Sequence, residues 1–337
     1  MIYVLAALYV LSGVCQPLIM TLCKVAGLAD PKAQLYMVFY SAGPSLLAIG
    51  IDIPQNRVLW KAVGVSLMDI LAQAMNYTGA SLAGPTIFAI VYSSVTVWTA
   101  VFSRVFLKRS LEWLQWFAVW VVFGGLVLTA THSVAVGPDV GRGTLLILVG
   151  SCLHAGMYVM SEAIMREGLT ARQNSSWQAI VGLCTMVTWQ VLYTLPRWDE
   201  VILEPAEAAG TTLVHALSIL LAFGLANMVH SLSFFNTLKD FPGGATSAGV
   251  MKGLQAVLVF VVADLAYCGR YGGSEMCFSE SKFASLVTVV GGVTLFGVVT
   301  ERQHRESGYH VISEESTTAA DTIPEIAESP SVVVEVR

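Results

Sequence analysis

The chain has 337 residues, of which 55% are hydrophobic and only 12% are charged, and its formal net charge is −5. Soluble domains carry roughly 25% charged residues, so this composition excludes a water-soluble fold, which could not bury so much apolar surface. The sequence also lacks a basic run, a phosphate-binding loop and a metal-ligand cluster. We therefore expect membrane lipid around the protein, no nucleic-acid partner and no cofactor.

Ten hydrophobic stretches follow one another along the chain, and we expect each to form a membrane-spanning helix. Helices are expected because an open sheet edge would leave unpaired backbone groups in lipid. The first stretch begins almost at Met1 without a basic region or a cleavage site, so it is predicted to be a retained span rather than a signal peptide. The stretches cover residues 2–23, 34–51, 59–79, 84–106, 112–132, 143–164, 177–196, 212–236, 243–267 and 282–300.

Lysine and arginine residues in the short loops predict the orientation of the helices, because cytosolic loops carry an excess of both. The loops on the side of the N-terminus hold more of them than the loops on the opposite side. They are Arg57, Lys61, Lys108, Arg109, Arg166, Arg172, Lys239, Arg302 and Arg305. We therefore predict an integral multi-pass membrane protein with both termini in the cytosol.

An internal repeat relates the two halves of the chain. When Asn76 is aligned with Asn236, Tyr92 falls on Lys252, and the third and fourth stretches fall on the eighth and ninth. Five helices per half is an odd number, so the two halves have opposite orientations, as in many secondary transporters that bind substrate between them. The predicted fold is all-α, with inverted five-helix repeats at residues 1–135 and 136–300.

Residues 69–128 carry a family resemblance. The marks are a short loop between two spans, an apolar span that ends in Phe-Leu-Lys-Arg at residues 106–109, and the pair Gly124-Gly125, which Gly291-Gly292 repeats in the second half. The chain resembles the EamA-type repeats of the drug/metabolite transporter superfamily. Within it, the chain is most similar to nucleotide-sugar-transporter-like solute carrier family 35, in its F-type or chloroquine-resistance-transporter-like branch. The resemblance implies that the third, fourth, eighth and ninth spans line a substrate cavity.

Asp69 lies in the middle of the third stretch. A carboxylate inside a membrane can exchange a proton or bind a cation, so Asp69 is predicted to couple transport to protons or to bind a cationic group of the substrate. The alternatives are a permanent ion pair with Lys252 and a carboxylate that only orients helices.

Other polar side chains lie on the same helices and are predicted to bind hydroxyl or amide groups of the substrate. Interhelical hydrogen bonds are the alternative reading. His154 and His230 could respond to the acidity of a compartment, or they could be neutral rings bonded to a neighbouring helix. The predicted substrate-binding set comprises Asn76, Tyr92, Asn227, His230 and Asn236, together with Asp69 and Lys252.

Lys252 stands in the middle of the ninth stretch. A charge at this depth costs about 2.5–3.5 kcal/mol on insertion scales, so it needs water, a partner or a substrate. Gly249 and Gly253 bracket it at a spacing that lets a neighbouring helix approach closely. We predict that Lys252 faces a central cavity and binds an anionic group. A purely structural pair with a buried carboxylate, or extension towards the nearer membrane surface, is the alternative.

Cys268 and Cys277 flank the last loop on the non-cytosolic side, with a short, glycine-containing segment between them. A disulfide is sterically easy at this spacing and the compartment would permit it. Two free thiols are the alternative.

The chain after Thr300 is polar, acidic and rich in Ser, Thr and Pro, so residues 301–337 are predicted to be a disordered cytosolic tail. Tyr309 and Ile312 form a Tyr-x-x-bulky pattern that resembles a clathrin-adaptor sorting signal. This resemblance implies an adaptor partner and an endolysosomal membrane, while the Golgi, the endoplasmic reticulum and the plasma membrane stay open.

Together these features predict a secondary active transporter of a small polar or anionic metabolite. An enzyme is not expected, because no nucleophile, base and orienting residue occur at reactive spacing. A nucleotide-sugar antiporter of the Golgi or endoplasmic reticulum and a membrane scaffold that does not transport remain alternatives. A homodimer is also compatible with the sequence.

Overall fold

The computed structural model describes residues 2–52, 56–83, 88, 91–127, 138–270 and 277–321, and all regular structure within these ranges is helical. The longer helices of the first half are α1 (Ile2–Val25), α2 (Leu35–Ser45), α3 (Asn56–Ala83), α5 (Val95–Phe106) and α6 (Trp113–Val127). Those of the second half are α7 (Pro138–Arg166), α8 (Ala171–Trp189), α10 (Leu213–Asp240), α11 (Gly244–Tyr267) and α12 (Glu280–Asp321). A short helix, α9 (Glu204–Ala208), precedes α10. Each of the ten predicted stretches therefore contains a helix in its described part.

Seven of these helices are long and apolar enough to cross a membrane, namely α1, α3, α7, α8, α10, α11 and the first part of α12. The helices α2, α5 and α6 are apolar but shorter. Large apolar side chains cover the outside of the molecule, and Leu213, Val214 and Leu265 are 74%, 79% and 76% exposed. Such extensive apolar exposure needs lipid rather than water around it, and the chain has the make-up of a multi-pass helical membrane protein.

Local sequence signals set the ends of several helices. At the start of α8, the hydroxyl of Thr170 accepts a hydrogen bond from the backbone N–H of Gln173, whose side chain accepts one from the N–H of Thr170. Gly27, just beyond α1, has a φ of +71°, and a Cβ there would lie 2.3 Å from the carbonyl oxygen of Pro205. A glycine is therefore needed where the chain turns from α1 towards α2.

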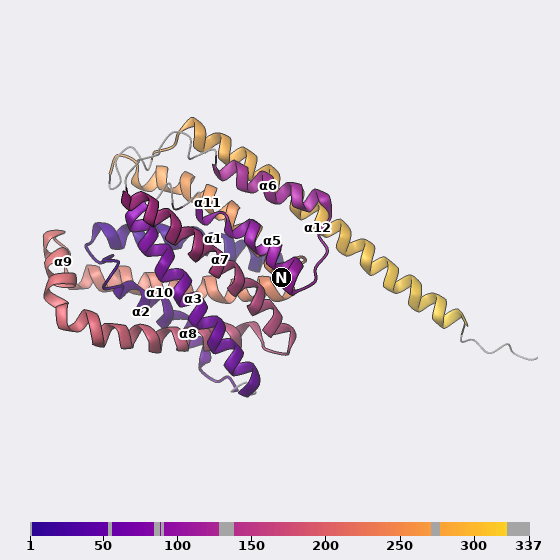
Figure 1. Ribbon diagram of the computed structural model, residues 1–337, viewed down its shortest axis with the longest axis horizontal. Coiled ribbons are helices and arrows are strands. Elements are labelled where there is room, and N and C mark those ends of the chain that lie inside the picture. The colour runs from indigo at the N-terminus through magenta and orange to yellow at the C-terminus, as the bar shows by residue number, and fades with distance from the viewer. Residues whose placement is uncertain are drawn as a thin grey trace, which may run out of the picture.

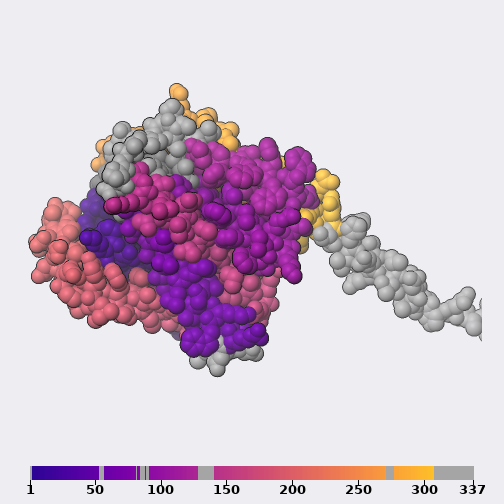
Figure 2. Space-filling view, in the orientation of Figure 1, coloured from indigo at the N-terminus to yellow at the C-terminus, as the bar shows by residue number. Residues whose placement is uncertain are grey.

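Helices of the two halves are interleaved rather than separated into two bodies. The helix α1 packs on α10, α3 packs on α7, and α2 lies between α8 and α10. Figure 1 shows α6 beside α12 along one edge of the molecule and α2, α8 and α10 along the other. Colours from early and late parts of the sequence meet on the face shown in Figure 2. A space enclosed by such a body is therefore lined by both halves.

The helix α12 continues to Asp321 and extends away from the body (Figure 1). We predicted a disordered tail from residue 301, whereas the structure has helix as far as Asp321, and residues 322–337 lie outside the described part. Ion pairs one turn apart join Arg305 to Glu301 at 3.0 Å and Arg302 to Glu306 at 2.8 Å. Extending an existing helix costs less than starting a new one, and pairs at this spacing add stability, so a polar sequence can prolong the last span.

Candidate functional site

A cavity of about 540 Å³ lies in the middle of the molecule, within the size range of small-molecule sites. Its walls come from α1, α2, α3, α7, α8, α10 and α11. At one end, which we call the open end, it is lined by Lys24, Pro31 and Lys282, which lie at helix ends or in a loop. At the opposite end, which we call the closed end, the lining stops about two helical turns inside α7 and α11, at Tyr158 and Lys252. On α8 and α10 it stops at Ser175 and Phe235, about one turn inside each helix.

Five of the seven predicted substrate-binding residues line this cavity, and Lys252 is the most informative of them. Its Nζ lies 3.4 Å from Nε2 of His230 and 5.7 Å from the centre of the Tyr9 ring. Among the described residues, no carboxylate forms an ion pair with it. The predicted alternative of a permanent Lys252–Asp69 pair is therefore absent from this conformation.

His230 lies between Lys252 and α1. Its Nδ1 is 3.1 Å from the hydroxyl of Ser12, and that hydroxyl donates a hydrogen bond to the carbonyl of Leu8 at 2.5 Å. The Ser12 oxygen is then free to accept, which assigns the ring proton to Nδ1 and leaves Nε2 to accept a hydrogen bond from Lys252. A neutral imidazole thus orients the ammonium group without neutralising its charge.

Asp69 lines the wall formed by α3 and lies 3.1 Å from Nδ1 of His154 on α7. The facing atoms, Oδ1 and Nδ1, are both buried, and neither has a partner in hydrogen-bond geometry. The two groups form an ion pair only when the imidazole is protonated. Tyr92 packs against the same imidazole, with ring centres 5.9 Å apart, and stacks on Phe88 at 5.1 Å. This wall therefore offers an aromatic surface beside an acid–imidazole pair.

Asn227 lines the cavity and forms hydrogen bonds through both ends of its side-chain amide. Its Oδ1 accepts from Gln16 at 2.5 Å, and its Nδ2 donates to the carbonyl of Tyr40 at 2.6 Å. The hydroxyl of Tyr40 in turn accepts from Gln73 at 3.1 Å. Four helices, α1, α10, α2 and α3, are thus joined by one chain of amide and hydroxyl groups, and Asn227 holds this wall together.

Two predicted site residues, Asn76 and Asn236, are not among the residues that line this cavity, and their role in substrate binding stays a prediction. Asn76 is 1% exposed and packs where α3 crosses α7, and a Cβ on Gly150 would lie 2.5 Å from its Oδ1. Asn236 donates a hydrogen bond to the carbonyl of Leu232 in its own helix at 2.7 Å. A polar residue in an apolar helix can face a neighbouring helix as readily as a cavity, and the sequence alone does not distinguish the two.

Aromatic side chains form the floor of the cavity towards the closed end. The ring of Phe234 lies 4.5 Å from that of Tyr158, 4.9 Å from that of Phe235 and 5.5 Å from that of Tyr9. These four residues belong to one buried apolar cluster that also contains Leu238. The cluster separates the cavity from the helix ends beyond it.

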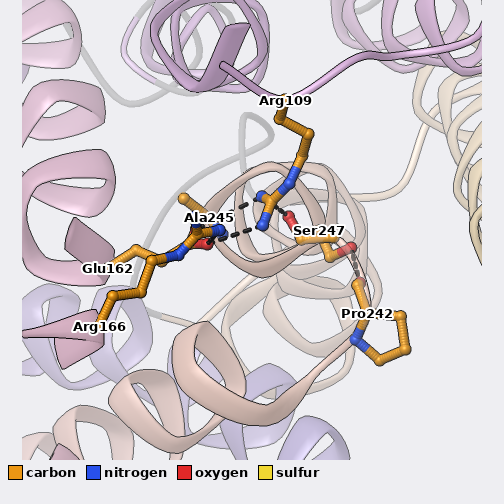
Figure 3. A network of polar contacts seen from close by, with 7 residues as sticks. Arg109, Glu162, Arg166, Pro242, Ala245 and Ser247 are labelled. Carbon is orange, nitrogen blue, oxygen red and sulfur yellow. Dashed lines mark hydrogen bonds and ion pairs between the residues drawn. The ribbon is translucent and has the colours of Figure 1, made fainter. Parts of the chain in front are cut away.

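Beyond this floor, the carboxylate of Glu162 accepts hydrogen bonds from three segments of the chain (Figure 3). Arg109, in the loop between α5 and α6, donates to it at 2.7 and 3.4 Å, and Arg166 donates at 2.7 Å. The backbone N–H of Ala245, in the first turn of α11, donates to it at 2.6 Å. Arg109 also donates to the carbonyl of Gly243. The Glu162 side chain is only 5% exposed, so this is a buried carboxylate whose charge is compensated.

Cys268 and Cys277 are joined by a disulfide, with their Cα atoms 4.6 Å apart, in the turn between α11 and α12 at the open end. The other predicted element of function, the pair Tyr309 and Ile312, lies on the extension of α12, and its side chains are outside the described residues.

Sequence reasoning missed several residues that shape the site. Tyr40, Tyr77 and Tyr158 line the cavity, but a tyrosine differs too little in polarity from the apolar residues around it to be noticed in the sequence. Gln16 was missed as well, although an amide one residue before Pro17 in an apolar helix is a signal that could have been used. Pairing of Arg109 with Glu162 joins residues far apart in the chain, so no local pattern reveals it.

No family model and no curated protein matches the chain. Solved structures do match, in 29 chains. One of them, a crystal structure of a protein, has a TM-score of 0.64 and 15% sequence identity, over 86% of this chain and 98% of that chain. At this identity the likeness concerns the fold alone, so the helical arrangement described above recurs in a molecule that matches over nearly its whole length.

Proposed function

We propose that this protein is a secondary active transporter that carries a small polar or anionic metabolite across a membrane by alternating access. One observation carries the proposal: Lys252, with which no described carboxylate forms an ion pair, places a cation in a cavity that reaches one end of the helices but not the other. An unpaired charge inside a membrane costs about 2.5–3.5 kcal/mol. An anionic ligand that enters from the open end would offset this cost.

Helix packing supports an origin of the molecule in two equivalent halves. If α1, α2, α3, α5 and α6 are equated in order with α7, α8, α10, α11 and α12, then the contact of α1 with α10 becomes that of α7 with α3. The contact of α5 with α7 likewise becomes that of α11 with α1. All four of these helix–helix contacts are present in the structure. The contacts α2–α8, α5–α11 and α6–α12 map onto themselves and also occur. Five helices per half make these repeats inverted, and exchange of their conformations would open the other end.

In the orientation predicted from the loop charges, the closed end faces the cytosol, since it carries Lys61, Arg109 and Arg172. The open end, with its disulfide, then faces a lumen or the outside. In this proposal Asp69 and His154 form the proton site, because a carboxylate and an imidazole in contact can exchange a proton between the two faces.

The experiment that tests this proposal is uptake by the purified protein in liposomes. The panel contains nucleotide sugars, amino acids, short peptides and vitamins, each with and without an inward proton gradient, with empty liposomes and a proton ionophore as controls. We expect gradient-dependent uptake of one class of substrate. Exchange of a nucleotide sugar for a nucleoside monophosphate without a gradient would favour the antiporter, and neither uptake nor exchange of any member would favour the non-transporting scaffold.

A further inference from the structure

Glu162 is placed where the two halves of the chain meet at the closed end. Arg109 belongs to the first half, whereas Glu162, Gly243 and Ala245 belong to the second. The guanidinium of Arg109 contacts both the carboxylate on α7 and the carbonyl just before α11. One side chain from the first half thus binds two helices of the second half.

The local backbone is built for close approach of this carboxylate. Gly243 and Gly244 have φ angles of +85° and +47°, and a Cβ at residue 244 would lie 2.4 Å from Oε2 of Glu162. The start of α11 has no side-chain cap of its own. Glu162 supplies the acceptor for the N–H of Ala245, and its negative charge lies at the positive end of the helix. Arg109, Glu162 and Arg166 converge on this point in Figure 3.

We propose that Glu162 is the positioning residue that keeps the cavity shut at the closed end, with Arg109 as its partner across the two halves. Loss of the Glu162 charge releases the α5–α6 loop from the start of α11 and from the end of α7. The population of protein molecules then shifts towards a conformation in which the cavity is open at this end and narrowed at the other. This inference takes its alternating conformations from the proposed transport function, but its test needs no substrate, so a failed uptake assay would leave it standing.

The test is a pair of spin-label distance measurements on full-length protein in lipid nanodiscs. Cysteines replace Arg104 and Asp240 to report on the closed end, and Lys32 and Glu280 to report on the open end, after the four free cysteines are replaced. All four labelled positions are exposed. The variant is Glu162→Gln, which keeps the shape of the side chain and its ability to accept from Ala245.

The matched control is Glu167→Gln, at the same end of the molecule. Glu167 pairs with Lys61 on the surface, and both side chains are more than a third exposed. We expect Glu162→Gln to lengthen the distance at the closed end and shorten it at the open end, and Glu167→Gln to leave both distributions as in the unmodified protein. A merely structural role would broaden the distributions without moving the two ends in opposite directions.

If Glu162→Gln gives the same two distributions as Glu167→Gln in protein that elutes as a folded species, the proposal is overturned. Should Glu162→Gln fail to fold, Arg166→Gln takes its place. Its side chain is half exposed and Arg109 remains on the carboxylate, so a smaller shift in the same directions is expected, and no shift overturns the proposal.

Discussion

Replacing Lys252 with methionine separates a ligand-binding lysine from a structural one. Methionine keeps most of the length of the side chain but removes the charge. In the described part of the chain the ammonium interacts with His230 and the ring of Tyr9 at the distances given above, and no described carboxylate forms an ion pair with it. The substitution therefore leaves no buried acid without its partner.

The size of both effects follows from these contacts. Removing the unpaired charge saves about 2.5–3.5 kcal/mol of burial in the membrane. It loses one hydrogen bond of about 1 kcal/mol and a cation–π contact of about 0.5–2 kcal/mol. Stability should therefore stay the same or rise. An anionic substrate would lose a charge-assisted hydrogen bond of about 1.5–3 kcal/mol, which weakens its binding about 10- to 100-fold.

Two measurements on the same preparation test these expectations. Thermal unfolding of purified protein gives the sign of the stability change without any knowledge of the substrate. The apparent KM for the substrate class found in the liposome panel gives the loss of binding. Lys24→Met is the matched control, because Lys24 lies at the mouth of the same cavity and is exposed, so its loss should change KM little.

A clear drop in thermal stability would refute the reasoning. Breaking a buried ion pair by removing one partner costs about 3–5 kcal/mol, so such a drop would mean that Lys252 is held by a carboxylate in the membrane and serves the fold. An unchanged KM together with unchanged stability would remove Lys252 from the substrate site.

Three further predictions concern the rest of the site and the fold. Asp69→Asn should abolish the effect of a proton gradient on uptake while counterflow of substrate persists, and gradient-driven uptake at the original rate would exclude Asp69 as the proton site. Gly150→Ala should lower the midpoint of thermal unfolding by an amount that corresponds to about 1–3 kcal/mol, because its Cβ would meet Asn76 and the carbonyl of Ala72. Gly291→Ala, where a Cβ meets nothing within 4 Å, should raise that midpoint slightly, and equal effects of the two substitutions would contradict the packing of α3 on α7. In denatured, unreduced protein a maleimide should label Cys15, Cys23, Cys152 and Cys184 only, and labelling of all six cysteines before reduction would contradict the disulfide.

The helices could be predicted from the sequence because each one is a long local signal. The ninth stretch, expected at residues 243–267, is α11 at Gly244–Tyr267, and the Pro242-Gly243 pair marks its start without reference to any other part of the chain. The end of the last helix was missed for the opposite reason. A polar sequence carries little information on whether a helix that has already formed will stop.

The candidate site was predictable only where a residue contrasts with its own helix. Lys252 and Asp69 are charges in apolar runs, and both line the cavity. Asn76 and Asn236 show the same contrast in weaker form but face a neighbouring helix and their own backbone. Tyrosines do not stand out in polarity from the apolar residues of their helices, although Tyr40 and Tyr158 line the walls of the cavity. The direction in which a side chain points depends on which helices meet, and that information is not local.

A comparison of the two buried charges supports separate roles for them. At the closed end the carboxylate of Glu162 has two guanidinium groups and a backbone N–H within 2.7 Å, so this fold can compensate a buried charge fully. No described carboxylate forms an ion pair with Lys252, even though Asp69 lines the same cavity. Asp69 instead contacts His154, and Lys252 contacts His230. Opposite charges that line one cavity but contact different imidazoles are the arrangement that the proposed transport site requires.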